Sequence, residues 1–405
     1  MLHLDRDFQP YNQTMTKAAI TPQDLSWPFW PIVPLYPYGQ RRTIRQEVVK
    51  DTLWTFEQLQ GIFYVVVPIR MTVIKLASGG LFVYAPVAPT PECIRLMREL
   101  ESEHGEVKYI ILPTISGIEH KVFVGPFARY FPKAIVYVAP NQWSFPLNLP
   151  LSWLGLPAKR TEILPADSAT TPLGKDFSYE ILPAIDLNVG YFSEVAFFHH
   201  YSQTLLLTDG IISIPENPPA ILELDPYPLL FHAKNSAKDL VEDTPENRRR
   251  GWQRICLFAL YFQPPVLAVP NWIKVFRDAF TAKEKSKKAY FGLFPFQWGD
   301  DWQKTFLNLR REGRLIVAPI LQTLILNRTT NEVSQWVDRI CQWPIKQVIP
   351  CHFASPIQAD SQEFQQAFSF LSKDSYLPKD DLECLESIDS FLVRWRLTPP
   401  PDKKL

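Results

Sequence analysis

Strands and helices alternate between residues 62 and 139, and this alternation constrains the fold more than any other feature. The run starts with two β-rich stretches, IFYVVVPI and RMTVIKLASGGLFVYAP, in which Ser78 to Gly80 supply a hairpin turn. A helix is then expected in TPECIRLMRELESEHG, with Thr90 as N-cap, Pro91 in the first turn and Gly105 as the stop signal. The strands VKYIILP and KAIVYVAP follow, separated by the helix-like EHKVFVGPFARYFP. Since these strands are almost entirely apolar, we expect a parallel α/β sheet buried on both faces.

The rest of the chain divides into segments that differ in expected secondary structure and charge. Residues 160–215 contain hairpin-like strands, residues 216–300 are helical and charged, and an α/β pattern resumes up to the strand IKQVIPCHF. Residues 1–60 hold WPFWPIVPLYPYGQRR, where proline recurs too often for a helix or a central strand, so the segment should run extended over the body or over a partner. We therefore predict an extended arm (1–60), a main domain (61–358) with a helical insertion (216–300), and a C-terminal helix and tail (359–405).

Composition limits the classes of function. With 405 residues and 46% hydrophobic residues the chain can bury a large core, and its 42 basic and 42 acidic residues give no overall field for nucleic acid. Five scattered cysteines without a C-x-x-C pair, and an N-terminus without a signal-peptide pattern, predict a reducing, intracellular location. Residues 255–273 are nearly uncharged but are cut by three prolines, which predicts a buried helix and an extended segment, with an interfacial helix as the alternative. No transmembrane segment is expected, and peripheral membrane contact and the oligomeric state stay open.

The order of elements resembles the metallo-β-lactamase fold, an αββα sandwich with metal ligands on loops at one edge of two packed sheets. The order is hairpin, helix, strand, polar loop, helix, strand, then hairpins that end in TDG, helices, and a strand that ends in CHF. The stretch EHKVFVGPFARYFPKAIVYVAPNQWSFPLNLPLSWLGLP is similar to an uncharacterised family of cyanobacterial and chloroplast proteins placed in that superfamily. The resemblance implies an α/β sandwich with a degenerate metal site, in a cyanobacterial or chloroplast setting.

The resemblance also implies where metal ligands would lie. The superfamily's H-x-H-x-D-H loop falls on ISGIEH, so that Ile115 and Gly117 occupy the first two histidine positions, Glu119 the aspartate position and His120 the last histidine position. A further histidine of the family falls near Gly190 and is also missing. All three missing histidines belong to the first metal of the two-metal enzymes.

The ligands of the second metal are nominally retained. The bridging aspartate corresponds to Asp209 in LLLTDG and the final histidine to His352 in VIPCHF. Together with Glu119 and His120, these residues could hold one divalent ion such as Zn, Fe or Mn, since imidazole and carboxylate suit all three. The alternative is a relic without a metal, in which Glu119 caps the following helix and the other three side chains form a hydrogen-bonded polar cluster.

Two functions follow from these alternatives. The first is a non-catalytic or weakly catalytic protein that binds a small molecule or a protein partner in the former active-site pocket, with an aromatic rim that includes Trp143, Trp153 and Trp298. The second is a single-metal hydrolase or oxidoreductase. Ordinary two-metal hydrolysis is not expected, because a bridging hydroxide needs both ions for activation.

Other polar residues give weaker signals. His199 and His200 lie in a predicted hairpin turn, one pointing inward and one outward, and His232 lies in the insertion. The run NRRRGWQR predicts an exposed basic face, with phosphate binding as the alternative. The chain has no G-x-S-x-G, P-loop or G-x-G-x-x-G motif, so serine hydrolase, NTPase and dinucleotide-binding functions lack support.

Overall fold

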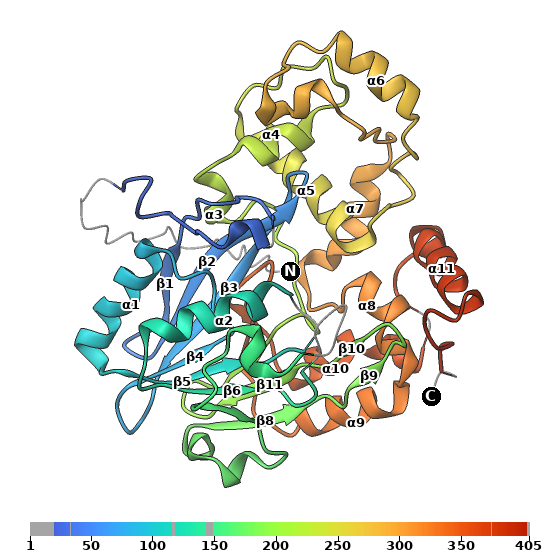
Figure 1. Cartoon of the computed structure of the whole chain (residues 1–405). Coiled ribbons are helices and arrows are strands. Elements are labelled where there is room, and N and C mark those ends of the chain that lie inside the picture. Colours follow the sequence, from blue (N-terminus) through green and yellow to red (C-terminus); the bar gives the residue numbers. More distant parts are fainter. Residues whose placement is uncertain (1–19, 33, 116–117, 143–148, 374, 403–405) are drawn as a thin grey trace, which may run out of the picture.

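The computed structural model describes residues 20–32, 34–115, 118–142, 149–373 and 375–402. Within these residues two β-sheets form the centre of the molecule, and a short hairpin of β9 (Ile185–Asp186) and β10 (Tyr191–Phe192) stands beside them (Figure 1). The first sheet has the order β1-β2-β3-β4-β5-β6-β7, antiparallel as far as β4 and parallel from β4 to β7. The second has the order β14-β13-β12-β11-β8, in which only β12 and β13 are parallel.

The strands of the first sheet are β1 (Ile44–Val49), β2 (Leu53–Ile62), β3 (Val65–Lys75), β4 (Leu81–Tyr84), β5 (Val107–Leu112), β6 (Ile135–Val138) and β7 (Thr161–Ile163). Those of the second sheet are β8 (Phe177–Ile181), β11 (Val195–His199), β12 (Thr204–Leu207), β13 (Gln347–Pro350) and β14 (Ile357–Gln358). The expected parallel strands are thus present in the first sheet, and the hairpins expected after residue 160 supply most of the second.

Alternating side chains place the two sheets face to face. In β4, Phe82 and Tyr84 point into a core shared with Phe177 and Phe197 of the second sheet. Their neighbours in β4 point to the opposite face, into a separate core that includes Phe123 of α2. Because side chains of a strand alternate between faces, each sheet buries one face against the other sheet and one against helices. The αββα sandwich expected from the resemblance is confirmed.

Helices cover both outer faces and also make up most of residues 216–300, the segment called the insertion below. The α-helices are α1 (Pro91–His104), α2 (Ile118–Tyr130), α3 (Ala220–Glu223), α4 (Tyr227–Ala233), α5 (Pro245–Tyr261), α6 (Trp272–Phe280), α7 (Trp302–Arg310), α8 (Pro319–Leu324), α9 (Thr330–Ile340), α10 (Ser361–Ala367) and α11 (Lys379–Arg394). The 3₁₀ turns are η1 (Trp30–Ile32), η2 (Leu151–Leu154), η3 (Ser168–Thr170), η4 (Pro172–Lys175), η5 (Lys287–Gly292), η6 (Arg311–Gly313), η7 (Leu326–Arg328) and η8 (Ser369–Leu371). Figure 1 places α1 and α2 over the first sheet and α9 and α10 over the second, while α3 to α6 project from one end.

The described part of the N-terminal arm lies on the body and on the insertion. Trp27 is buried against Phe123 of α2, with ring centroids 5.3 Å apart. The hydroxyl of Tyr36 donates a hydrogen bond to the carboxylate of Asp225, between α3 and α4. The arm therefore joins the first sheet's helical layer to the insertion.

The apolar stretch 255–273 begins as a buried helix, as predicted. Cys256, Leu257 and Leu260 of α5 are buried, and the helix ends at Tyr261, before the first of the prolines. Among the described helices, none has both the length and the apolar character needed to cross a bilayer.

Candidate functional site

His120, Asp209 and His352 lie at one edge of the sandwich, where strands from both sheets end. Asp209 follows β12 and His352 follows β13, two parallel neighbours whose register pairs Leu207 with Pro350. His120 is the third residue of α2, which begins just after β5. Since parallel strands end at the same edge, this topology brings residues that are far apart in sequence to one place.

The contact between His352 and Asp209 defines the centre of the site. Nε2 of His352 lies 3.2 Å from Oδ1 of Asp209, and Nδ1 of His352 lies 2.9 Å from the carbonyl oxygen of Pro68 in β3. A carbonyl only accepts, so Nδ1 carries a proton, and an attractive contact with Asp209 then requires either a second proton on Nε2 or a cation between the two atoms. Burial alone would raise the pKa of Asp209, but the hydrogen bond and charge of His352 hold that pKa below its usual range.

His120 carries a buried ring nitrogen without a hydrogen-bond partner among the described residues. Its Nδ1 lies 3.2 Å from the carbonyl oxygen of Pro86, so the proton is on Nδ1 and Nε2 keeps its lone pair. The side chain is fully buried, Nε2 has no hydrogen-bond partner among the described residues, and the ring centroid lies 6.3 Å from that of His352. Burial, and then the charge of His352, lower the pKa of His120 to about 4, so the ring is neutral at neutral pH.

Glu194 supports Asp209 from behind. Its Oε2 accepts hydrogen bonds from the backbone N–H of Thr208 at 2.9 Å, the Thr208 hydroxyl at 2.7 Å and the Asp209 N–H at 3.2 Å. Burial, followed by the charge of Asp209, raises the pKa of Glu194 to about 7. A Cβ on Gly210 would lie 1.9 Å from Oε1 of Glu194, so a larger residue in the TDG motif would have to displace this buried carboxylate.

Arg70 fixes the loop that carries His352. This buried side chain of β3 pairs with Glu57 at 2.7 Å and donates to the carbonyl oxygen of Phe353 at 2.7 Å and to that of Pro350. Trp252 of α5 packs on Phe353 from the other side, with ring centroids 5.9 Å apart. Sheet one and the insertion thus both hold the His352 loop in place.

The first-metal positions carry no ligand side chain where they are described. Ile115 is fully buried in the core between the two sheets, and its N–H bonds to the carbonyl oxygen of Ser193. Gly190 lies in the turn between β9 and β10. Gly117, the side chain of Glu119 and the whole of Trp143 lie outside the described residues. Across the described residues, no three His, Cys, Asp or Glu side chains are grouped as a site that could hold a metal ion. Imidazole and carboxylate donors suit a divalent ion, but the described side chains of His120, Asp209 and His352 do not form a coordination shell.

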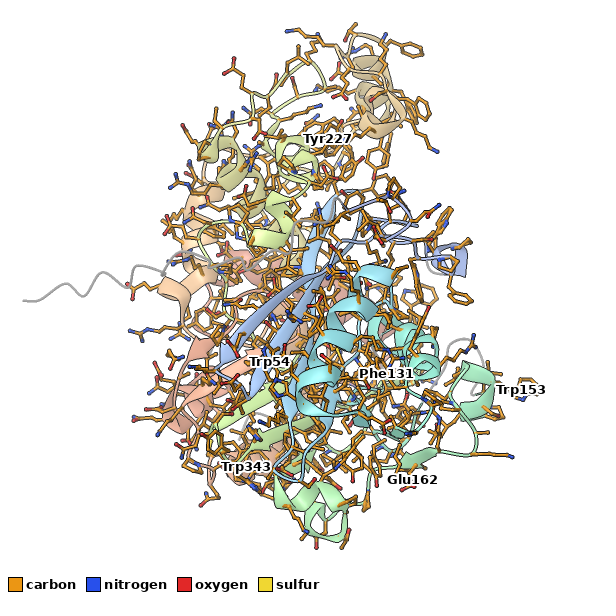
Figure 2. The ribbon with its side chains drawn as sticks, turned by 90° about the vertical axis from the view of Figure 1, so that its left-hand side faces the viewer. Trp54, Phe131, Trp153, Glu162, Tyr227 and Trp343 are labelled. Atoms are coloured by element: carbon orange, nitrogen blue, oxygen red, sulfur yellow. The ribbon has the colours of Figure 1, made fainter. Side chains whose placement is uncertain are left out.

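The two described tryptophans of the expected aromatic rim lie apart from this cluster. Trp153 points outward from η2 and is 75% exposed (Figure 2). Trp298 packs on the guanidinium of Arg254, which lies 5.5 Å from the ring centroid. Neither forms an aromatic pair with His120 or His352 among the described side chains.

The histidines expected in the hairpin turn and in the segment 216–300 have structural partners. Of the two histidines that were expected to point in opposite directions, His199 points inward, where Nδ1 meets the Ser202 hydroxyl at 2.7 Å, and His200 is exposed. His199 is buried at the end of β11. His232 is buried and hydrogen-bonds the carbonyl oxygen of Phe63 at 3.1 Å.

The arginines of NRRRGWQR meet carboxylates or carbonyls rather than an open anion site. Arg248 pairs with Glu223 and Asp243, which line the same cleft of about 440 Å³, and Arg254 is buried against carbonyls at the end of α4. The phosphate-binding alternative gains no support, and the expected exposed face is wrong for Arg254.

Sequence reasoning missed Arg70, Glu57 and Glu194. A usable signal was present, because Arg70 and Glu194 are charged residues inside the apolar runs VVVPIRMTVI and SEVAFF, and such residues are buried only with partners.

Solved structures resemble the chain only remotely. A variant of the flavo di-iron protein from Thermotoga maritima shares 9% identity at a TM-score of 0.42, covering 83% of this chain and 64% of that one. The metal-soaked Flv1 flavodiiron core from Synechocystis sp. PCC6803 shares 9% at 0.40, with 82% of this chain covered and 60% of that chain, so the match spans about three fifths of its length. The metallo-beta-lactamase from Pontibacter korlensis shares 8% at 0.36, covering 81% and 99%. At these scores no ligand or activity is transferred to this chain.

No curated protein matches the chain. A family described as Domain of unknown function (DUF4336) matches residues 50–370, which include the strands from β2 to β14, the segment 216–300, and His120, Asp209 and His352. That match covers well over half of the sequence, and the chain belongs to this family.

Proposed function

We propose that this protein is a metallo-β-lactamase-like binding protein, non-catalytic or weakly catalytic, that holds a small molecule or a segment of a protein partner over His120, Asp209 and His352. The observation that carries the proposal is the burial of Ile115 in the inter-sheet core, at a position that the resemblance reserves for a histidine of the first metal. A fully buried isoleucine offers no donor atom, so a two-metal centre lacks its first ion.

The cluster that is left has the character of a binding site. The side chains of Asp209 and His352 are 26% and 12% exposed, so the site opens to solvent on their side. Behind them, Nε2 of His120 is a buried acceptor without a partner among the described residues, and such an atom costs free energy unless a ligand or water supplies a hydrogen-bond donor. A ligand group such as a hydroxyl or amine would meet this need while contacting Asp209.

The alternative function is that of a single-metal hydrolase or oxidoreductase, and one observation favours it. Both imidazoles donate Nδ1–H to backbone carbonyls, as histidines that ligate metals do, and Nε2 of His352 lies 3.2 Å from Asp209. His120, Asp209 and His352, with Glu119, would hold one Zn, Fe or Mn ion, which when bound would polarise a substrate oxygen or exchange electrons.

Bound metal and turnover together test the proposal. The purified protein should hold less than one metal ion per chain, unchanged by His120→Ala or His352→Ala. It should not hydrolyse a chromogenic β-lactam, a phosphodiester or a thioester above buffer, with or without added Zn²⁺ or Mn²⁺. Small molecules that copurify with the wild type and are lost from Asp209→Asn would support binding at this site. One metal ion per chain that both alanine variants lose, or turnover that they abolish, would establish the alternative.

The cyanobacterial or chloroplast setting remains a proposal that rests on the sequence resemblance. The reducing, intracellular location rests likewise on the spacing of the cysteines and on the N-terminal sequence.

A further inference from the structure

Helix α6 exposes its apolar side chains to solvent. Ile273 is 83% exposed, Phe280 80%, and Trp272 and Phe276 54% each, whereas Val275 is the one residue of this described helix that is buried. A helix on the surface of a globular protein ordinarily presents polar residues outward. In α6, by contrast, these four apolar side chains face outward. We call them the α6 apolar face.

The four side chains form one continuous surface. At 3.6 residues per turn, Trp272, Phe276, Phe280 and Ile273 fall within an arc of about 100° around the helix axis. Val275 and Ala279 lie beside one edge of this arc, about 60° and 20° beyond Trp272. There η5 packs so closely that a Cβ on Gly292 would lie 3.0 Å from the carbonyl oxygen of Ala279. The protein itself thus covers this edge of the helix, and the four exposed side chains are left uncovered.

Basic residues lie within α6 and follow it in the sequence. Residues 269–292 contain six lysines and arginines and two acidic residues, a net charge of +4 in a chain whose total formal charge is zero. Four exposed lysines follow α6, Lys283 and Lys285 in the loop and Lys287 and Lys288 at the start of η5. Nearby acids neutralise part of this charge, since Lys274 pairs with Asp278 at 3.0 Å and Lys288 approaches Asp225 at 3.7 Å.

The position of α6 gives it access to a broad surface. Figure 1 shows α6 at the outer end of the insertion, away from both sheets, and Figure 2 shows the same end free of other elements. A planar partner could therefore meet the helix without touching the sandwich.

We propose that α6 binds the interfacial region of a membrane that contains anionic lipids. Its apolar face would enter the boundary between headgroups and acyl chains, with Trp272 at headgroup depth, and the lysines that follow would contact lipid phosphates. The charge argues for this occupant over a second copy of the chain, because two α6 segments of charge +4 would repel each other. The inference goes beyond the binding function proposed for His120, Asp209 and His352 and does not depend on it.

Vesicle sedimentation tests the proposal. The full chain should sediment with vesicles of equimolar phosphatidylcholine and phosphatidylglycerol, and its partition should fall about tenfold or more on phosphatidylcholine alone or in high salt. The double variant Ile273→Asp/Phe280→Asp should lower the partition on anionic vesicles by on the order of a hundredfold, because two charged side chains replace the most exposed apolar ones.

A matched control separates position from charge. Tyr201→Asp/Trp395→Asp replaces two residues that are 80% and 65% exposed elsewhere on the surface and adds the same charge, so it should bind vesicles like the wild type. Equal urea midpoints for all three proteins would establish that each is folded. The proposal is overturned if the wild type does not bind anionic vesicles, if both double variants bind equally, or if gel filtration shows a dimer that only the α6 variant loses.

Discussion

At the scale of single residues, the buried charged side chains of Arg70 and Glu194 explain how the loops that carry His352 and Asp209 are held in place. Arg70 is buried between the first sheet and the His352 loop, and its guanidinium is shared by Glu57 and two backbone carbonyls. A buried arginine of this kind is stabilising only while its partners remain, since each partner has given up its water. The same holds for Glu194 behind Asp209.

Replacing Arg70 tests this role directly. Arg70→Met should lower the free energy of unfolding by about 3–5 kcal/mol, because Glu57 and the carbonyls of Pro350 and Phe353 lose their donor in a buried place. Urea unfolding at pH 7 measures the loss. Adding Glu57→Leu should restore part of it, because the uncompensated carboxylate is then gone. If Arg70→Met unfolds at the wild-type urea concentration, Arg70 does not fix the loop.

The sequence identified His120, Asp209 and His352 because they carry the residue types of a known motif in the expected order. It could not show that His352 Nε2 lies 3.2 Å from Asp209, or that Glu194 bonds the Asp209 N–H. Those contacts depend on how two sheets pack, and residue type alone does not specify packing.

At the scale of elements, local signals predicted helix ends well. Helix α1 spans Pro91–His104, the Thr90 hydroxyl accepts from the N–H of Cys93 at 3.2 Å, and Gly105 ends the helix with φ of 95°. The N-cap of α5 likewise is Thr244, which accepts from the N–H of Asn247 at 3.2 Å. Such contacts join residues three positions apart, so a short stretch of sequence determines them.

Helix α5 connects the insertion to the site through Trp252, so its cap has more than a local effect. Thr244→Ala should destabilise the protein by about 1 kcal/mol, because an N–H in the first turn loses its acceptor. Urea unfolding measures this loss, and Thr244→Ser, which keeps the hydroxyl, should remain close to the wild type. An alanine variant as stable as the serine variant would mean that solvent replaces the cap at no cost.

At the scale of the whole molecule, two buried histidines test whether the insertion and the sandwich unfold together. His199 lies in the second sheet and His232 in α4, and burial lowers the pKa of each to about 4. The unfolded chain protonates histidine near pH 6.5, so each of them takes up a proton on unfolding between about pH 6 and 5. Each therefore removes stability as pH falls through this range, by about 1.4 kcal/mol per pH unit.

Urea unfolding of wild type, His199→Gln and His232→Gln at pH 7, 6 and 5 checks this expectation. In each variant the free energy of unfolding should depend less on pH, by the uptake of one proton. The insertion and the sandwich should unfold in one transition in all three proteins. Two separate transitions, with the effect of His232 confined to one of them, would contradict cooperative unfolding of the insertion and the sandwich.

The sequence by itself determined the order of strands and helices, and its resemblance to a known fold gave the sandwich class. The order depends on apolar periodicity, caps and turns, which act over a few residues. Only the tertiary structure decided that Ile115 joins the core, that Arg70 reaches Phe353 across 283 positions of the chain, and that α6 turns its apolar side outward. The physical reason is that such contacts are set by the packing of whole layers, in which residues distant in sequence compete for the same buried space.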